Sequence, residues 1–339
     1  MSDETLLADW AGYARNLEAA LHRCILGLDR PIRLILAAVF ARGHVMLEGD
    51  VGVGKTTLLR AVARGLGGAF ERIEGTIDLM PTDLIYYSHV DWDGRPRIDP
   101  GCLLKHGEEL SIFFFNEVNR ARPQVHSLLL RIMAERSVTA FNREYRFPHL
   151  LVFADRNRLE KEETFEIPSA ARDRFLMELS IEIPEDPSIL RSLMIEPRFH
   201  DIETLIEAIP PAIVPFRQLY EVSAVIQRTI HVSPDLERYA LELWCATRDP
   251  GAYGIRLEGV EMDRLLLAGA SPRGMSMMLR AARVMAWLFD RSMVVPEDIQ
   301  EVFIETVAHR LCFQPIYEIR RSQLARELLS KIIRTIAAP

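Results

Sequence analysis

One short segment constrains this chain more than any other feature. Residues 49–56 read Gly-Asp-Val-Gly-Val-Gly-Lys-Thr and match the pattern GxxxxGK[ST] in full; a strand-like run, Gly43–Leu47, precedes them and a helical pattern, Lys55–Leu66, follows. The glycines of such a turn let backbone N–H groups surround phosphate oxygens, and the helix N-terminus adds about half a positive charge. The segment therefore predicts a nucleotide site in which Lys55 reaches the β- and γ-phosphates and Thr56 offers a hydroxyl to Mg²⁺.

A second motif supports this prediction and departs from its usual form. The segment IFFFNEVNRA, Ile112–Ala121, is an apolar run that ends in Asn116-Glu117, where ATPases of this kind carry an acidic pair. Glu117 can orient the attacking water. Asn116 brings no charge and can only accept a hydrogen bond from a metal-bound water, so we expect weak Mg²⁺ coupling or slow turnover. The alternative to an ATP-hydrolysing enzyme is a nucleotide-gated scaffold with little hydrolysis.

The remaining patterns predict an α/β fold followed by helices. Strand-like runs alternate with helical segments, which favours a mostly parallel five-stranded sheet. After residue 187 prolines cluster, and from Arg217 onward the pattern is helical. We therefore expect an α/β core with N-terminal helices at 1–187, a linker at 188–216 and an all-helical domain at 217–339. The other four expected strands are Phe70–Ile73, Ser111–Phe115, Leu150–Ala154 and Leu176–Ile183.

Two segments interrupt this alternation and are predicted to form hairpins. Tyr86–Ile98 contains Asp93-Gly94 between strand-like stretches, and Ser137–Phe147 turns at Asn142. Asp91-Trp92-Asp93-Gly94 is similar to part of a calcium loop, but it lacks the third early ligand and the late glutamate. A hairpin turn is therefore favoured there.

Charge and cysteine usage exclude several classes. The net charge of −7 disfavours general nucleic-acid binding and makes a nucleic-acid motor the weakest alternative. The four cysteines are scattered singly, which indicates neither a zinc site nor a disulfide framework. No apolar stretch is long enough to span a bilayer, and the acidic start does not resemble a signal peptide. We expect a cytoplasmic protein without membrane insertion.

Several separated motifs together resemble the MoxR family of AAA+ ATPases. They are HVMLEGDVGVGKTTLLRAVARGL, DLMPTDL, FNEVNRARPQVHSLLLRIMAERSVT, the Asn157 segment, IPSAARDRF and GASPRGMSMMLRAARV, in the family's order over Leu26–Leu311. The resemblance implies a P-loop AAA+ core with a helical lid, and a sheet in which Gly43–Leu47 lies beside Ser111–Phe115. It also implies ATP hydrolysis with ATP and Mg²⁺ as cofactors.

The resemblance also assigns roles to individual residues. Asn157 matches the first sensor, Arg174 the arginine finger that acts on a neighbouring subunit's nucleotide, and Arg273 the second sensor. Glu117 keeps the water-orienting role, while Thr56 and Asn116 face the metal. The remaining nucleotide contacts are the adenine-facing Leu26 and Gly27 and the loop residues Gly49, Asp50, Val51, Gly52, Val53, Gly54, Lys55 and Thr57.

An arginine that acts in trans implies a ring, which in this family is a homo-hexamer. The hairpins are expected to point at a central pore or the client, and the resemblance implies a chaperone that remodels a client protein. It also implies a von Willebrand factor A-domain partner. FADRNRLEKEETFEIP is similar to the branch linked to methanol dehydrogenase maturation, which suggests metal or cofactor insertion into such a client.

The chain departs from the family pattern in three places. Asn116 stands where an Asp is usual. Asp155-Arg156-Asn157-Arg158 places extra charge near the γ-phosphate. The tip of the first hairpin, His89–Pro96, is also unusual. The first of these departures, at Asn116, puts full catalytic power in question.

Overall fold

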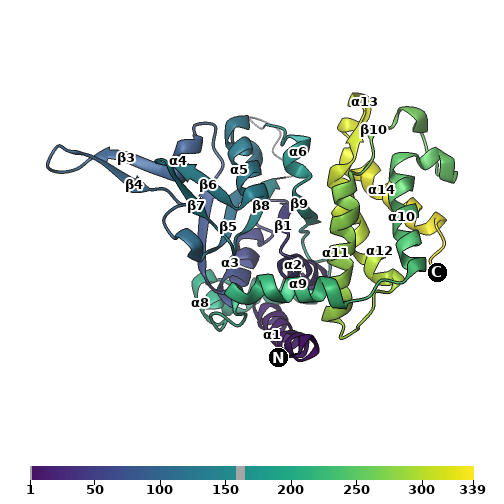
Figure 1. Ribbon diagram of the computed structural model, residues 1–339, viewed down its shortest axis with the longest axis horizontal. Helices are drawn as coiled ribbons and strands as arrows, with labels where there is room; N and C mark the ends of the chain where they lie inside the picture. The colour runs from purple at the N-terminus through teal and green to yellow at the C-terminus, as the bar shows by residue number, and fades with distance from the viewer. Residues whose placement is uncertain (1, 158–164) are drawn as a thin grey trace. The chain divides into compact units, whose positions relative to one another are not determined.

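A computed structural model describes residues 2–157 and 165–339 of the chain. Within the described residues, two compact units are distinguished (Figure 1). One comprises Gly12–Arg174 and Leu179–Tyr220, and it contains the phosphate loop. The other comprises the N-terminal residues up to Ala11, Phe175–Glu178 and Glu221–Pro339.

The five expected strands form a single sheet, in the order β2-β5-β8-β1-β9. The pairs β2–β5, β5–β8 and β8–β1 are parallel, as predicted. Apolar side chains are buried along the central strands, which explains their uninterrupted hydrophobic runs. The strands are β1 (His44–Gly49), β2 (Ala69–Glu74), β5 (Leu110–Asn116), β8 (Leu151–Asn157) and β9 (Phe175–Ser180).

One expectation about this sheet is wrong. β1 does not lie beside β5, because β8 is inserted between them: Met46 on β1 pairs with Ala154 of β8, and Ala154 pairs with Phe115 of β5. That expectation came from the family resemblance, and the apolar runs, which identify strands, carry no information on long-range pairing that could have corrected it. The observed order places the end of β8 between the phosphate loop and Asn116-Glu117.

The helices of the unit that contains the phosphate loop form where apolar residues recur at helical spacing and where the residue before the helix allows it to begin. In α2 (Asp29–Phe40), eight residues are buried, which marks an interior helix rather than a surface one. α3 (Lys55–Leu66) begins directly after Gly54, whose φ of 87° few other residues adopt. The other helices here are α1 (Asp3–Cys24, which begins in the other unit), α4 (Pro81–Ile85), α5 (Pro123–Glu135) and α6 (Ser169–Arg172).

Both predicted hairpins are confirmed. β3 (Tyr86–Val90) pairs antiparallel with β4 (Pro96–Pro100), and β6 (Ser137–Ala140) with β7 (Arg143–Arg146). In the first turn the Asp91 carboxylate accepts hydrogen bonds from the N–H groups of Asp93 and Arg95 and from the Arg97 side chain. Those bonds close the turn, as a hairpin requires. In the second turn, Phe141 and Asn142 both have positive φ, as a tight two-residue hairpin demands.

Residues 188–216, for which the sequence suggested a linker, form helices in the same unit as the sheet. α7 (Pro187–Ile195) begins at a proline, and the Asp186 side chain caps it. α8 (Ile202–Glu207) buries Leu205 and Ile206. The backbone N–H of Ala212 donates to Arg64 O of α3 at 2.9 Å, so the segment is joined to the phosphate-loop helix. Pro187 and Pro197 begin helical turns, whereas Pro210 and Pro211 lie at a turn after α8.

The part of the second unit that follows Glu221 is mostly helical. Serine caps open two of its helices, with Ser233 accepting from Leu236 N and Ser271 from Gly274 N. The C-terminal helix buries its apolar stripe, as expected for packing onto this unit. A short antiparallel pair, β10 (Leu266–Ala268) with β11 (Cys312–Phe313), departs from the all-helical expectation, because isolated pairs this short leave no period in the sequence. The helices are α9 (Leu219–Thr229), α10 (Pro234–Arg248), α11 (Pro272–Leu288), α12 (Pro296–Val307), α13 (Pro315–Glu318) and α14 (Arg321–Thr335).

Two features bear on the chain's surroundings. Across the described residues, we find no helix with the length and apolar character to cross a membrane. The cysteines Cys24, Cys102, Cys245 and Cys312 are all free thiols. Burial raises the pKa of the Cys102 thiol to about 12, so this thiol is inert rather than reactive.

Candidate nucleotide-binding site

The phosphate loop joins β1 to α3 and depends on glycine at three positions. Gly52 and Gly54 have φ of 82° and 87°, and a Cβ on Gly49 would lie 2.4 Å from Ile181 O of the neighbouring chain segment. The Lys55 side chain is buried within this loop, where its Nζ donates to Gly49 O at 2.6 Å and Asp50 O at 3.2 Å. The ammonium group is therefore held where phosphates would displace these carbonyls.

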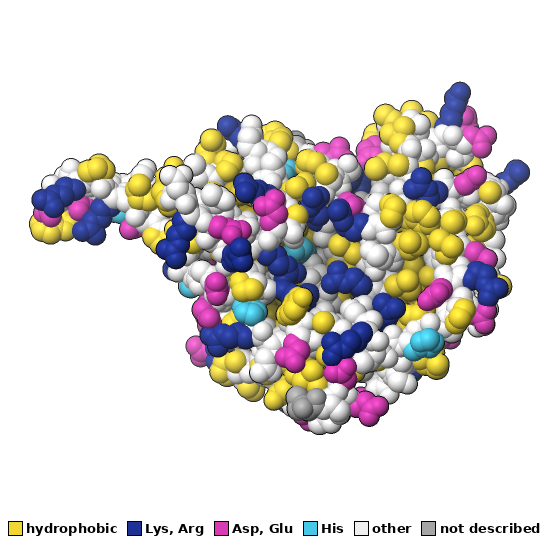
Figure 2. Space-filling model, in the orientation of Figure 1, with side chains coloured by type: hydrophobic (Ala, Val, Ile, Leu, Met, Phe, Trp, Pro, Cys, Tyr) yellow, Lys and Arg dark blue, Asp and Glu magenta, His cyan; other side chains and the backbone are white. Residues whose placement is uncertain are grey.

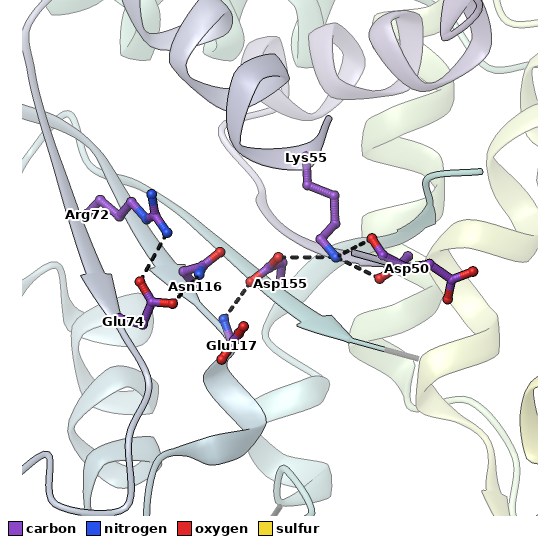
Figure 3. A network of polar contacts seen from close by, with 8 residues as sticks. Asp50, Lys55, Arg72, Glu74, Asn116, Glu117 and Asp155 are labelled. Carbon is purple, nitrogen blue, oxygen red and sulfur yellow. Dashed lines mark hydrogen bonds and ion pairs between the residues drawn. The ribbon is translucent and has the colours of Figure 1, made fainter. Parts of the chain in front are cut away.

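Asp155 connects the phosphate loop to the end of β5 (Figure 3). Its side chain is buried, with one oxygen, Oδ2, 3.5 Å from Lys55 Nζ. The other oxygen, Oδ1, accepts the backbone N–H of Glu117 at 2.6 Å. Burial raises the pKa of Asp155, while the Glu117 N–H and the Lys55 ammonium act in the opposite direction. One buried carboxylate thus touches both the lysine of the loop and the backbone of the water-orienting glutamate.

Asn116 is engaged on the opposite side of β5. Its Nδ2 donates to Glu74 Oε1 at 3.1 Å, and Arg72 donates to Glu74 Oε2 at 3.1 Å (Figure 3). The N–H of Gly75 donates to Asn116 O at 2.7 Å, which locks the end of β2 against β5. An ionised carboxylate only accepts hydrogen bonds, so the Glu74 carboxylate must face the NH₂ group of Asn116. The Oδ1 of Asn116 is therefore left available as an acceptor.

Glu117 occupies a strained backbone position. Its φ of 51° and ψ of 47° lie in the left-handed region, which costs a residue other than glycine about 1 kcal/mol or more. Its carboxylate pairs with Arg120 at 2.9 Å. Beneath it, His126 donates through Nε2 to Val118 O at 2.7 Å, and burial lowers the pKa of this ring. The strain turns the glutamate out of the strand direction at the sheet edge, where a reacting water could be oriented.

An apolar pocket of about 290 Å³ lies next to the loop. Its size is at the lower end of small-molecule sites. Leu26 contributes to its wall together with Gly52, Val53 and Gly54 of the phosphate loop. Gly27 is not part of the lining, but its φ of 73° turns the chain there, and a Cβ would meet Pro184 at 2.5 Å. The other lining residues are Cys24, Ile25, Leu28, Thr57, Ile183, Pro184, Leu190, Leu193, Phe199, Ile202 and Leu205.

The remaining predicted residues are distributed between the two units. Asn157 is buried and pairs with Gly49 as the last residue of β8, so this strand runs three residues beyond the Leu150–Ala154 run expected from the sequence. Arg174 follows α6 and donates to Ala170 O at 2.9 Å. Arg273 is the second residue of α11 and belongs to the other unit. Lys55, Glu117 and Asn157 therefore meet at one edge of the sheet. Arg158 lies outside the described residues.

The charged residues Asp155 and Arg156, which depart from the family pattern, each have a specific partner in the structure. The Arg156 guanidinium lies 3.1 Å from Glu48 Oε1 on β1, and Asp155 pairs with Lys55, so neither is a free charge near the phosphates. Sequence reasoning missed Glu74 altogether. The available signal was its place at the end of a strand, because the carboxyl ends of neighbouring parallel strands meet at one edge.

The residues at this edge fit a magnesium ion bound together with phosphates. A hydroxyl from Thr56, the Asn116 Oδ1 and an Asp155 carboxylate oxygen are all hard oxygen donors, as Mg²⁺ prefers. The described residues include no group of 3 or more His, Cys, Asp or Glu that could hold a metal by itself. Mg²⁺ usually takes one or two side chains and completes its shell with water and phosphate. When bound, Mg²⁺ neutralises charge on the phosphates.

Comparison with known proteins agrees with this geometry. Residues 44–177 match the model of the ATPase family associated with various cellular activities (AAA), and residues 263–332 match the AAA lid domain. Protein MoxR of Methylorubrum extorquens is 57% identical, covering 99% of this chain and 98% of its own length. Chaperone MoxR1 of Mycobacterium tuberculosis is 31% identical, covering 97% and 84%. A crystal structure from Cytophaga hutchinsonii, described as a candidate ATPase, has a TM-score of 0.83 at 28% identity and covers 99% and 98%.

Proposed function

This chain belongs to the MoxR family of AAA+ ATPases, and from that premise we propose that it hydrolyses ATP to remodel a client protein. The observation that carries the proposal is the juxtaposition at the sheet edge. A lysine held inside a glycine loop, a glutamate turned out of its strand and an apolar pocket meet there. This arrangement suits phosphoryl transfer to water, which depends on positioning and charge rather than on covalent chemistry.

We assign the ATP contacts as follows. The triphosphate lies on the loop, where Lys55 exchanges its carbonyl partners for phosphate oxygens and Thr56 and Asn116 face Mg²⁺. The adenine enters the apolar pocket, against Leu26 and the turn at Gly27. Other loop residues complete the contacts, through backbone N–H groups where these face the phosphates. They are Gly49, Asp50, Val51, Gly52, Val53, Gly54 and Thr57.

Hydrolysis is assigned to four side chains. Glu117 orients the water, and Asn157, which pairs with Gly49 across β8 and β1, contacts the γ-phosphate or that water. Arg174 reaches the nucleotide of a neighbouring subunit and stabilises transition-state charge. Arg273 senses the nucleotide from the lid. Because Arg174 acts in trans, the active form is a homo-oligomeric ring, for which we propose a hexamer.

The β3–β4 hairpin is the proposed client contact. It extends from the sheet in Figure 1, and its side chains include exposed apolar groups: Trp92 is 92% exposed, Val90 69% and Ile98 56%. Figure 2 shows charged side chains among hydrophobic ones at its tip. Exposed apolar side chains that gather on one arm, unlike singly scattered ones, are typical of a protein-contact surface, which suits transient contact with a client.

The partners follow from the sequence resemblance. We propose a von Willebrand factor A-domain protein as adaptor and a methanol dehydrogenase-type enzyme as client, into which metal or cofactor is inserted. The four free thiols fit a reducing compartment, and we place the activity in the cytoplasm.

Steady-state phosphate release with and without client tests the proposal. The native chain should release phosphate above background, and Glu117→Gln should bind ATP, assemble and retain client without turnover. Glu135→Gln changes an exposed acid on α5 that pairs with Arg131, and it serves as the matched control. ATP binding with turnover no higher than background in the native chain would favour the nucleotide-gated scaffold. Salt-sensitive stimulation by single-stranded DNA would favour a nucleic-acid motor.

A further inference from the structure

The charge missing at Asn116 is present on the neighbouring strand. β8 lies between β1 and β5, and Phe115 of β5 pairs with Ala154 of β8. Asn116 and Asp155 are therefore the next residues on two adjacent parallel strands. A carboxylate at either position reaches the same edge of the sheet, beside the phosphate loop.

We propose that Asp155 is a positioning residue that performs the metal-directed role of the absent acid at position 116. In this role the Asp155 carboxylate accepts hydrogen bonds from water in the magnesium shell of bound ATP. The inference rests on the proposed ATPase function and deepens it. Compared with a site that has an acid at position 116 on β5, the negative charge stands on the adjacent strand β8, and the total charge of the site is the same.

The contacts of Asp155 support this role. Its carboxylate lies 3.5 Å from Lys55 Nζ, and Lys55 adjoins Thr56, the residue expected to face the metal. Its Oδ1 also accepts the Glu117 N–H at 2.6 Å, so it is tied to the glutamate that orients water. An ionised carboxylate offers about four acceptor positions. These two contacts leave acceptor capacity on the Asp155 carboxylate.

The burial of Asp155 also needs an explanation. It is 2% exposed, and a buried carboxylate is costly unless it is paired and hydrogen-bonded. Its ion pair with Lys55 is loose, since the lysine makes a closer contact, 2.6 Å, with Gly49 O. A charge kept at this cost with an incomplete set of partners is suited to a cation complex that arrives with the nucleotide. Glu74, the other acid near Asn116, is half-exposed and already bonded to Arg72.

A charge-exchange experiment tests the inference. All proteins carry Glu117→Gln, so that ATP binds without turnover. The readout is the factor by which Mg²⁺, relative to EDTA, tightens binding of a fluorescent ATP analogue. Asp155→Asn should reduce a gain of about tenfold or more to less than about twofold, each tenfold step being about 1.4 kcal/mol. The double variant Asn116→Asp/Asp155→Asn should restore most of the gain.

The matched control is Glu48→Gln. It removes another buried carboxylate, one that pairs with Arg156 close to the loop, and it should leave the Mg²⁺ gain within about twofold because it lies outside the proposed metal site. Thermal melts confirm that each variant is folded, and the double variant decides the matter if Asp155→Asn alone is not.

Three outcomes overturn the inference. They are an unchanged Mg²⁺ gain in Asp155→Asn, a double variant that folds but does not regain it, and an equal loss in Glu48→Gln. Failure of the native chain to bind ATP under any condition would instead remove the proposed function itself. The two failures are therefore distinguishable.

Discussion

The phosphate loop and the strand ends beside it would both contact the nucleotide and its metal, but through different parts of their residues. The loop binds through its backbone, and its geometry depends on Gly49, Gly52 and Gly54, positions that tolerate no substitution without strain or collision. The strand ends act through side chains, and there the expected acid at 116 is replaced by Asn while a buried acid lies at 155. The glycines that shape the loop must stand at fixed positions in the sequence. A charged side chain can instead be supplied by a residue on the neighbouring strand.

The sharpest test of the strand-end side is Glu117→Gln. We expect the rate of phosphate release to fall by about 1,000-fold, since a positioned acid–base group contributes roughly 10²–10⁴-fold. ATP affinity should change little, because the loop is intact. A variant that retained more than about a tenth of the native rate would move the water-orienting role to another residue.

The corresponding test of the loop is Lys55→Ala. We expect ATP affinity to fall about 100-fold, since hydrogen bonds to charged groups contribute about 1.5–3 kcal/mol each. The loss should occur both with and without Mg²⁺, because this lysine acts on phosphate directly. Isothermal titration with ATP measures it. Lys105→Ala, an exposed lysine paired with Glu71, is the control and should bind normally.

Gly75→Ala tests how tightly the strand ends are held together. A Cβ at this position would lie 2.2 Å from Glu117 O, so the new methyl must displace the glutamate. Overpacking of this kind costs about 1–3 kcal/mol, and we expect a turnover loss of about tenfold with ATP affinity retained. Gly12→Ala, whose methyl meets no atom within 4 Å, should have neither effect. Equal behaviour of the two variants would contradict the close contact.

Asp155→Asn should stabilise the protein while weakening the site. Burial raises the pKa of Asp155, so the stability present below the ordinary carboxyl pKa is lost as pH rises through the folded-state pKa. Asparagine removes this loss, and Lys55 keeps two carbonyl acceptors. We expect the melting temperature at pH 7 to rise by about 2–4 °C, with the difference from native shrinking toward pH 4. A lower melting temperature at pH 7 would show that the ion pair with Lys55 outweighs burial.

The smallest expected effect belongs to Glu74→Gln. This side chain is half-exposed and paired with Arg72, and exposed pairs contribute at most about 1 kcal/mol. The rate of phosphate release should change by less than about threefold. A tenfold loss would instead identify Glu74, rather than Asp155, as the acid that compensates for Asn116.

Most of the fold was predictable because its signals are local. The glycine spacing predicted the loop, apolar runs predicted the five strands, and Asp93-Gly94 and the turn at Asn142 predicted both hairpins. The helices at 188–216 were not predicted. Proline clusters accompany both linkers and helix starts, and only the packing of Leu205 and Ile206 distinguishes these cases.

The sequence alone determined that this chain carries a phosphate loop on an α/β core, because a turn that depends on glycine is specified by residues adjacent along the chain. The order in which β8 separates β1 from β5, and the contacts of Asp155 with Lys55 and the Glu117 backbone, became visible in the three-dimensional structure. Strand order and side-chain pairing depend on contacts between residues far apart in the chain. Such contacts leave no period or motif in the sequence to be read.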